Sequence, residues 1–138
     1  MYCLRKLKSF NVSDEILQMF YSSVIGSIIY FGMTCWGGSL NQGCRGKLDK
    51  QIRRASRLVG REQDDVETMY ERQVTKKLAS VLADNTHPLY PEFDSRLIER
   101  SGRFRAPAGR TDRYRHSFIP TAIQAHNNKV GRQRRNSH

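Results

Sequence analysis

The stretch Ser13–Gly38, SDEILQMFYSSVIGSIIYFGMTCWGG, is strongly apolar and decides the expected fold class. Ser13 is a typical N-cap residue, and the two acids that follow it suit the positive end of a helix. Apolar side chains then recur at helical spacing, at Ile16, Phe20, Val24, Ile28 and Phe31. Two glycines close the stretch, as glycine commonly does past a helix C-terminus. The pattern predicts one helix over residues 14–36.

Residues 16–36 carry no charge, which raises the alternative of a membrane span, because about 20 apolar residues cross a bilayer. Small and polar residues such as Ser22, Gly26 and Ser27 weaken membrane insertion, and basic residues flank both ends. A second apolar stripe widens the first, at Leu17, Tyr21, Ile25 and Ile29. We therefore favour a helix buried against its neighbours and keep a membrane-associated protein as an alternative.

Two further helices are predicted, over residues 47–59 and 64–82. Gly60 ends the first of them, and Asp64-Asp65 begins the second as helix-capping residues. The apolar stripe of the last helix is Val66, Met69, Tyr70, Val74, Leu78, Val81 and Leu82. Because no alternating strand pattern occurs, we expect an all-α domain over residues 1–100 with a three-helix core.

The predicted helix 47–59 is amphipathic and strongly basic on its polar side. Asp49 is its only acid, and its cations are Lys47, Lys50, Arg53, Arg54 and Arg57. Such a face is able to contact the phosphates of a nucleic acid, whereas a solvated face that only confers solubility is the open alternative.

The net charge of +11 is unevenly distributed along the chain. Residues 1–60 carry +6, residues 61–100 carry −3 and residues 101–138 carry +8. The acidic middle segment is able to pair with either basic segment, which would lower the charge available to a partner. The last segment holds only five Leu, Ile, Val or Phe residues, so we expect a largely disordered tail over 101–138, with a short helix at 118–126.

The tail interleaves arginines with aromatic residues, a composition that suits phosphate contact and base stacking on single strands. The arginines are Arg103, Arg105, Arg110, Arg113 and Arg115, and the stacking candidates are Phe104, Tyr114 and Phe118. A charged, solvated tail without a partner is again the open alternative.

Motifs of catalysis or metal binding do not occur in the sequence. The three cysteines, Cys3, Cys35 and Cys44, form no CxxC pair and lie far from the histidines. We therefore expect no catalytic residues, no metal site, no cofactor and no small-molecule substrate. The start of the chain lacks the apolar stretch of a secretory signal, so a nuclear or cytoplasmic protein is expected.

Several stretches together resemble the C-terminal part of LINE-type reverse transcriptases of retrotransposons, over roughly residues 2–127. They are LRKLKSF at Leu4–Phe10, MFY at Met19–Tyr21, TCWGGS at Thr34–Ser39, LDKQI at Leu48–Ile52, ASRLVG at Ala55–Gly60, NTHPL at Asn85–Leu89 and RYRHSFIP at Arg113–Pro120. This resemblance implies the thumb and the region after the polymerase palm, which grips RNA and DNA without supplying catalytic acids. The chain departs from the pattern at Gly43 and Gly46, which replace helix-favouring residues.

The segment up to Trp36 is also similar to the N-terminal region of alkylated-DNA-repair AlkB homologues. Full-length members of that group join a 2-oxoglutarate-dependent dioxygenase to a tRNA methyltransferase, but the iron ligands and the methyltransferase glycine loop do not occur here. Our leading hypothesis is a non-catalytic fragment that binds RNA or DNA. A protein of the AlkB-homologue N-terminal type and a membrane-associated protein that uses residues 16–36 are the alternatives.

Overall fold

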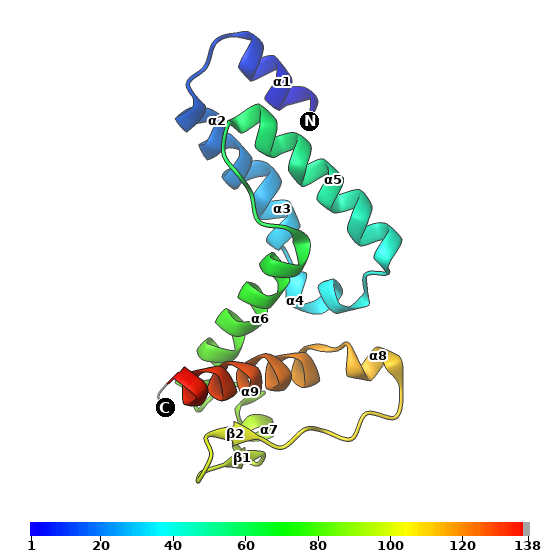
Figure 1. Ribbon diagram of the computed structural model, residues 1–138, viewed down its shortest axis with the longest axis vertical. Helices are drawn as coiled ribbons and strands as arrows, with labels where there is room; N and C mark the ends of the chain where they lie inside the picture. Colours follow the sequence, from blue (N-terminus) through cyan, green and yellow to red (C-terminus); the bar gives the residue numbers. More distant parts are fainter. Residues whose placement is uncertain (137–138) are drawn as a thin grey trace. The chain divides into compact units, whose positions relative to one another are not determined.

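The computed structural model describes residues 1–136 and consists mostly of helices (Figure 1). Over those residues its one sheet is a two-stranded antiparallel hairpin. The predicted all-α class is therefore confirmed. The chain divides into two compact units, of which unit 1 comprises Met1–Met33 and Leu40–Met69. Unit 2 comprises Thr34–Ser39 and the chain from Tyr70 onward.

The predicted helix over residues 14–36 is interrupted, which corrects its boundary. Its parts are α2 (Asp14–Phe20), the π-helical turn η1 (Tyr21–Gly26), α3 (Ser27–Tyr30), α4 (Met33–Trp36) and the 3-10 turn η2 (Gly37–Ser39). Phe31 is extended, and Gly32 has a φ of 60°. Glycine adopts this left-handed conformation without the steric cost of a side chain, so the helix stops at Tyr30.

The side of α2–η1–α3 that packs inward carries the second of the two predicted apolar stripes. Leu17, Tyr21 and Ile29 are buried, whereas Ile28 is 71% and Phe31 83% exposed. Of the first predicted stripe, only Phe20 packs against the core, where it is half-buried. We call its exposed members, Ile16, Val24, Ile28 and Phe31, the exposed stripe. Because apolar residues cover most of this helix, periodicity alone could not choose between its two sides.

Across residues 1–136, no single helix is both long and apolar enough to cross a bilayer. The pair Asp14–Tyr30 and Met33–Ser39, bent by 41°, meets the length and composition requirement together.

The core of unit 1 forms where three helices meet. Helix α1 (Tyr2–Ser9), which the sequence analysis did not anticipate, packs against α2 and α5. The buried residues of this core are Leu4, Leu17, Tyr21, Ala55 and Val59. Lys8 Nζ donates a hydrogen bond of 2.8 Å to the carbonyl oxygen of Leu58, which satisfies the last turn of α5.

Helix α5 (Gln42–Val59) begins five residues earlier than the predicted start at 47. The side chain of Asn41 accepts a hydrogen bond of 2.8 Å from the backbone N–H of Cys44, which caps the helix. This cap offsets the cost of Gly43 and Gly46, which both lie inside the first turns. Gly60 ends the helix with a φ of 74° in the left-handed region, as predicted.

Helix α6 (Val66–Ala83) closely matches the predicted range 64–82. Asp65 Oδ1 accepts a hydrogen bond of 2.8 Å from the N–H of Thr68. Hydrogen bonding from the Thr68 hydroxyl, and then from this N–H, holds the pKa of the Asp65 carboxyl below its ordinary value. Asp49 Oδ1 accepts a second one, of 2.9 Å, from the N–H of Val66. The predicted apolar stripe is buried except at half-buried Leu82.

Unit 2 also contains the helices and strands that follow α6. Its further elements are α7 (Tyr90–Asp94), β1 (Leu97–Ile98), β2 (Arg103–Phe104), α8 (Asp112–Arg115) and α9 (Phe118–Asn136). Leu97 pairs with Phe104 and Ile98 with Arg103, so the hairpin crosses the domain boundary predicted at residue 100.

The expectation of a disordered tail after residue 100 is wrong for residues 101–136, and Ser137 and His138 lie outside the described residues. Helix α9 extends well beyond the predicted 118–126. Phe104, Ala122 and Ile123 are buried. The side-chain amide of Asn127 accepts from the Phe104 N–H at 2.9 Å and donates to the Phe104 carbonyl at 2.8 Å. The tail folds because its few apolar residues pack with Phe93, which precedes residue 100.

The two sides of α3 give a paired test of this packing. We expect Ile29→Ala to lower the free energy of unfolding by about 2–4 kcal/mol, because Ile29 is buried. Ile28→Ala, at the exposed neighbouring position, should change it by less than about 0.5 kcal/mol. Urea denaturation of both variants measures the difference, and equal losses would contradict the assignment of the buried side.

The glycines of α5 give a second test. A Cβ at Gly46 meets no atom within 4 Å, so Gly46→Ala should raise the free energy of unfolding by about 0.5–1 kcal/mol. Gly60→Ala is the opposing control, because it places a side chain at a positive φ and 3.1 Å from the Asp14 carboxylate. Thermal unfolding should show Tm rising in the first variant and falling in the second.

Candidate nucleic-acid interface

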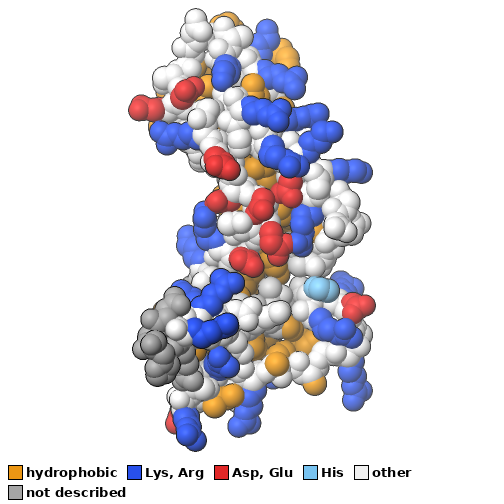
Figure 2. Space-filling view, in the orientation of Figure 1, with side chains coloured by type: hydrophobic (Ala, Val, Ile, Leu, Met, Phe, Trp, Pro, Cys, Tyr) orange, Lys and Arg blue, Asp and Glu red, His pale blue; other side chains and the backbone are white. Residues whose placement is uncertain are grey.

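Helix α5 presents its cations on its solvent side. Lys47 and all four other predicted contact residues of this helix are exposed. Their spacing of three or four residues aligns four of them along one side of the helix. These four, Lys50, Arg53, Arg54 and Arg57, line a hollow of about 380 Å³, which we call the basic hollow. Figure 2 shows Lys and Arg side chains gathered over α5.

The acidic residues near α5 leave the basic hollow without a counter-charge. Asp49, the only acid of the helix, is engaged with the N–H of Val66. Glu67, at the start of α6, pairs with Arg45, which lies outside the hollow. Among residues 1–136, no acidic side chain forms an ion pair with the four cations of the hollow. The acidic middle segment therefore neutralises little of this surface.

The predicted arginines of the tail are all exposed but are distributed over several elements. Arg103 and Arg105 flank Phe104 at strand β2, Arg110 lies in the loop, and Arg113 and Arg115 belong to α8. Arg115 Nη1 forms an ion pair of 3.2 Å with Asp112, whose negative charge partly offsets that of the guanidinium group. The arginines of the tail therefore do not lie along one side of a single helix, as the cations of α5 do.

The proposed base-stacking role is corrected for Phe104. Its ring is 4% exposed and packs edge-on against Phe93, with ring centroids 5.8 Å apart. Phe118 is half-buried, and its ring centroid lies 6.2 Å from that of Phe93, so it also packs in the core. The pattern Arg103-Phe104-Arg105 is the alternation of a half-buried strand, a signal that the sequence analysis passed over. Tyr114, which is half-buried, keeps its stacking role as a prediction.

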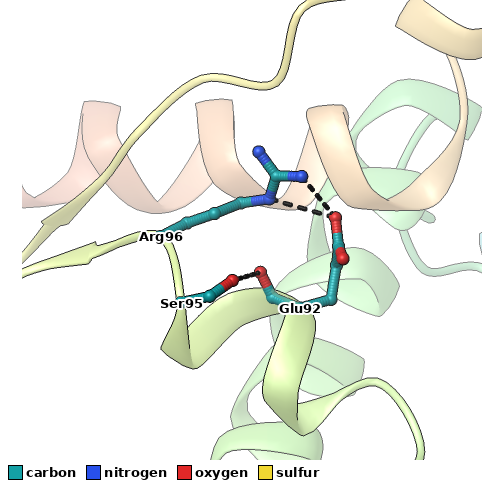
Figure 3. Close-up of polar contacts among 3 residues, drawn as sticks. All are labelled: Glu92, Ser95 and Arg96. Atoms are coloured by element: carbon teal, nitrogen blue, oxygen red, sulfur yellow. Dashed lines mark hydrogen bonds and ion pairs between the residues drawn. The ribbon is translucent and has the colours of Figure 1, made fainter.

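Another arginine of unit 2 is held in a local structural contact (Figure 3). Arg96 donates from Nε and Nη2 to Oε1 of Glu92, at 3.0 and 2.5 Å. Glu92 lies inside α7, and Arg96 follows the end of this helix, four residues later. Ser95 Oγ donates to the carbonyl oxygen of Glu92 at 3.3 Å. This pairing closes the C-terminus of α7 and removes Arg96 from the set of free cations.

The described part of the chain holds no group of three His, Cys, Asp or Glu side chains that could bind a metal ion. Its cysteines, Cys3, Cys35 and Cys44, are free thiols at exposed positions. Sequence reasoning missed Lys8, whose ammonium group lies at the C-terminus of α5. The apolar spacing of Leu4 and Leu7 within a basic segment is the signal that would have predicted α1 and placed this lysine.

No family model matches the chain, and neither the curated proteins nor the solved structures contain a match to it.

Proposed function

We propose that the chain is a non-catalytic nucleic-acid-binding fragment that holds RNA or DNA through its phosphates. The observation that carries this proposal is the basic hollow, where four exposed cations of one helix line a concave surface without an acidic partner. Lysine and arginine at such density bind phosphates by releasing condensed counterions, independently of base sequence. In this proposal the chain supplies no catalytic residue, cofactor or small-molecule substrate site.

The stretches that resemble LINE-type reverse transcriptases support the same proposal from the sequence. Two of them, LDKQI at Leu48–Ile52 and ASRLVG at Ala55–Gly60, lie on α5 and its C-cap. We propose that α5 descends from the part of a retrotransposon polymerase that grips nucleic acid. The arginines from Arg103 to Arg115 are a second contact region in this proposal.

The basic hollow predicts a measurable salt dependence. Binding to duplex DNA should weaken with a log–log slope of about 0.9 per phosphate contact, so four cations correspond to a slope of about 3.6. Arg53→Gln/Arg54→Gln/Arg57→Gln should reduce the slope by about 2.7 and weaken binding at low salt. Fluorescence anisotropy with labelled duplex DNA and single-stranded RNA at several salt concentrations measures both quantities.

A control variant distinguishes the effect of the basic hollow from the effect of the net charge of the chain. Arg61→Gln/Lys76→Gln/Arg100→Gln removes the same charge from exposed positions elsewhere and should largely preserve the slope. Equal losses in the two triple variants, or no binding by the unmodified chain at low salt, would refute a role for the basic hollow.

Association with a membrane surface is the second candidate function, and the exposed stripe is the observation that favours it. Solvent-exposed apolar side chains on one helical segment suit the boundary between headgroups and acyl chains. We expect Ile28→Ser/Phe31→Ser to abolish recovery with floated vesicles if this function operates. Recovery with neutral vesicles in high salt would indicate insertion, recovery only with anionic vesicles at low salt would indicate charge attraction, and no recovery would exclude this function.

A further inference from the structure

Unit 2 contains a hollow of about 420 Å³ beside helix α9, separate from the basic hollow. Ala106, Pro107 and Gly109 form one wall, and the first turns of α9 form the other. Its volume lies within the roughly 300–1,000 Å³ that small-molecule sites occupy, so it has room for a nucleobase with its sugar.

The walls of this hollow are apolar and held in place. Pro107, Pro120 and Ile123 line it, and Ile123 is only 1% exposed. The paired hydrogen bonds between Asn127 and the backbone of Phe104 fix strand β2, which leads directly into the wall at Ala106. The hollow is therefore largely preformed, as ligand sites usually are.

Two side-chain amides supply hydrogen-bonding groups to this apolar site. Gln124 and Asn128 line the hollow and lie four residues apart, on the same side of α9. Within residues 1–136 neither amide group has a hydrogen-bond partner, and both side chains are exposed. An amide offers a donor and an acceptor side by side, which matches the N6 and N7 groups of adenine.

Arg115 supplies a guanidinium group at the same hollow, held in place by two contacts. Its Nε donates to the carbonyl oxygen of Gly109 at 3.3 Å, and its Nη1 pairs with Asp112 at 3.2 Å. A guanidinium group has five N–H donors, so donors remain for a phosphate. A Cβ at Gly109 would lie 2.8 Å from Cγ of Arg115, so glycine is needed for this close approach.

We propose that the hollow binds an unpaired adenine nucleotide, with Gln124 and Asn128 on the base edge and Arg115 on the phosphate. A duplex exposes N6 and N7 only along its major groove, so a base that enters a hollow between a loop and a helix has to leave the stack, and the proposed ligand is therefore unpaired. This inference rests on the proposed function, to which it adds the recognition of a base.

The probe for this site is AMP, compared with ribose 5-phosphate and UMP in NMR titrations of the full chain. We expect AMP to shift the side-chain amide signals of Gln124 and Asn128 in a saturable manner. One bidentate contact is worth about 1–3 kcal/mol, so AMP should bind at least about fivefold more tightly than ribose 5-phosphate. UMP should be weaker than AMP.

The variants assign the roles. Gln124→Leu/Asn128→Leu should reduce AMP affinity to that of ribose 5-phosphate, whereas Gln42→Leu, at an exposed position of α5, should have no effect. Arg115→Gln should make AMP and adenosine bind equally. Thermal unfolding verifies that the double variant is folded, and Asn128→Ala replaces it if it is not. Equal affinity of the unmodified chain for AMP and ribose 5-phosphate, or undiminished AMP binding by the folded variant, would overturn the inference.

The two proposals fail separately. The α5 variant Arg53→Gln/Arg54→Gln/Arg57→Gln should bind duplex DNA more weakly, with its salt slope reduced by about 2.7, and keep its affinity for AMP. A chain that binds duplex DNA with a steep salt dependence but does not prefer AMP refutes only the adenine site. A chain that binds AMP without salt-dependent duplex binding refutes only the proposed function.

Discussion

The structure of unit 1 depends on the burial of one side of α5. Ala55 and Val59 are fully buried against Leu4 of α1 and Leu17 of α2. Burial of such side chains contributes about 25 cal/mol per Å² of apolar area, whereas the cations at the intervening positions gain nothing from burial. Packing that side inward therefore fixes the opposite side toward solvent. The cations of the basic hollow therefore face solvent because the opposite side of α5 is buried, and no separate contact has to hold them there.

The fold was predictable where sequence patterns had one solution. In α6 a single apolar stripe and two aspartates at its start indicated both its position and its buried side. The segment 14–36 had two solutions, because Ile28 and Ile29 are equally apolar and only tertiary packing decides which of them is buried. The tail was misjudged for a different reason. Its average composition indicated disorder, but Phe104 and Ile123 pack with residues that a composition count assigns to another segment.

The candidate site shows the same division between local and tertiary information. The exposure of Lys50, Arg53 and Arg54 follows from helical spacing, which the sequence displays directly. The inward role of Asp49 does not, because its partner is the N–H of Val66, seventeen residues away. Without that contact, one acid among the cations would be expected to neutralise part of the surface. The hollow of unit 2 was also beyond sequence reasoning, since it needs a loop and a helix to lie beside each other.

The basic hollow has an energetic consequence for the helix that carries it. Lys50, Arg53, Arg54 and Arg57 form four like-charged pairs at i,i+3 or i,i+4 spacing. Each such pair destabilises a helix by about 0.2–0.5 kcal/mol, so the set costs about 1–2 kcal/mol. The first turns of α5 are weak as well, because they contain Gly43 and Gly46. A phosphate chain that neutralises these cations removes the repulsion only in the folded helix, where the four charges are held together. Under the proposed function, binding and folding of unit 1 are therefore linked, because a polyanion that binds only the folded helix stabilises it by mass action.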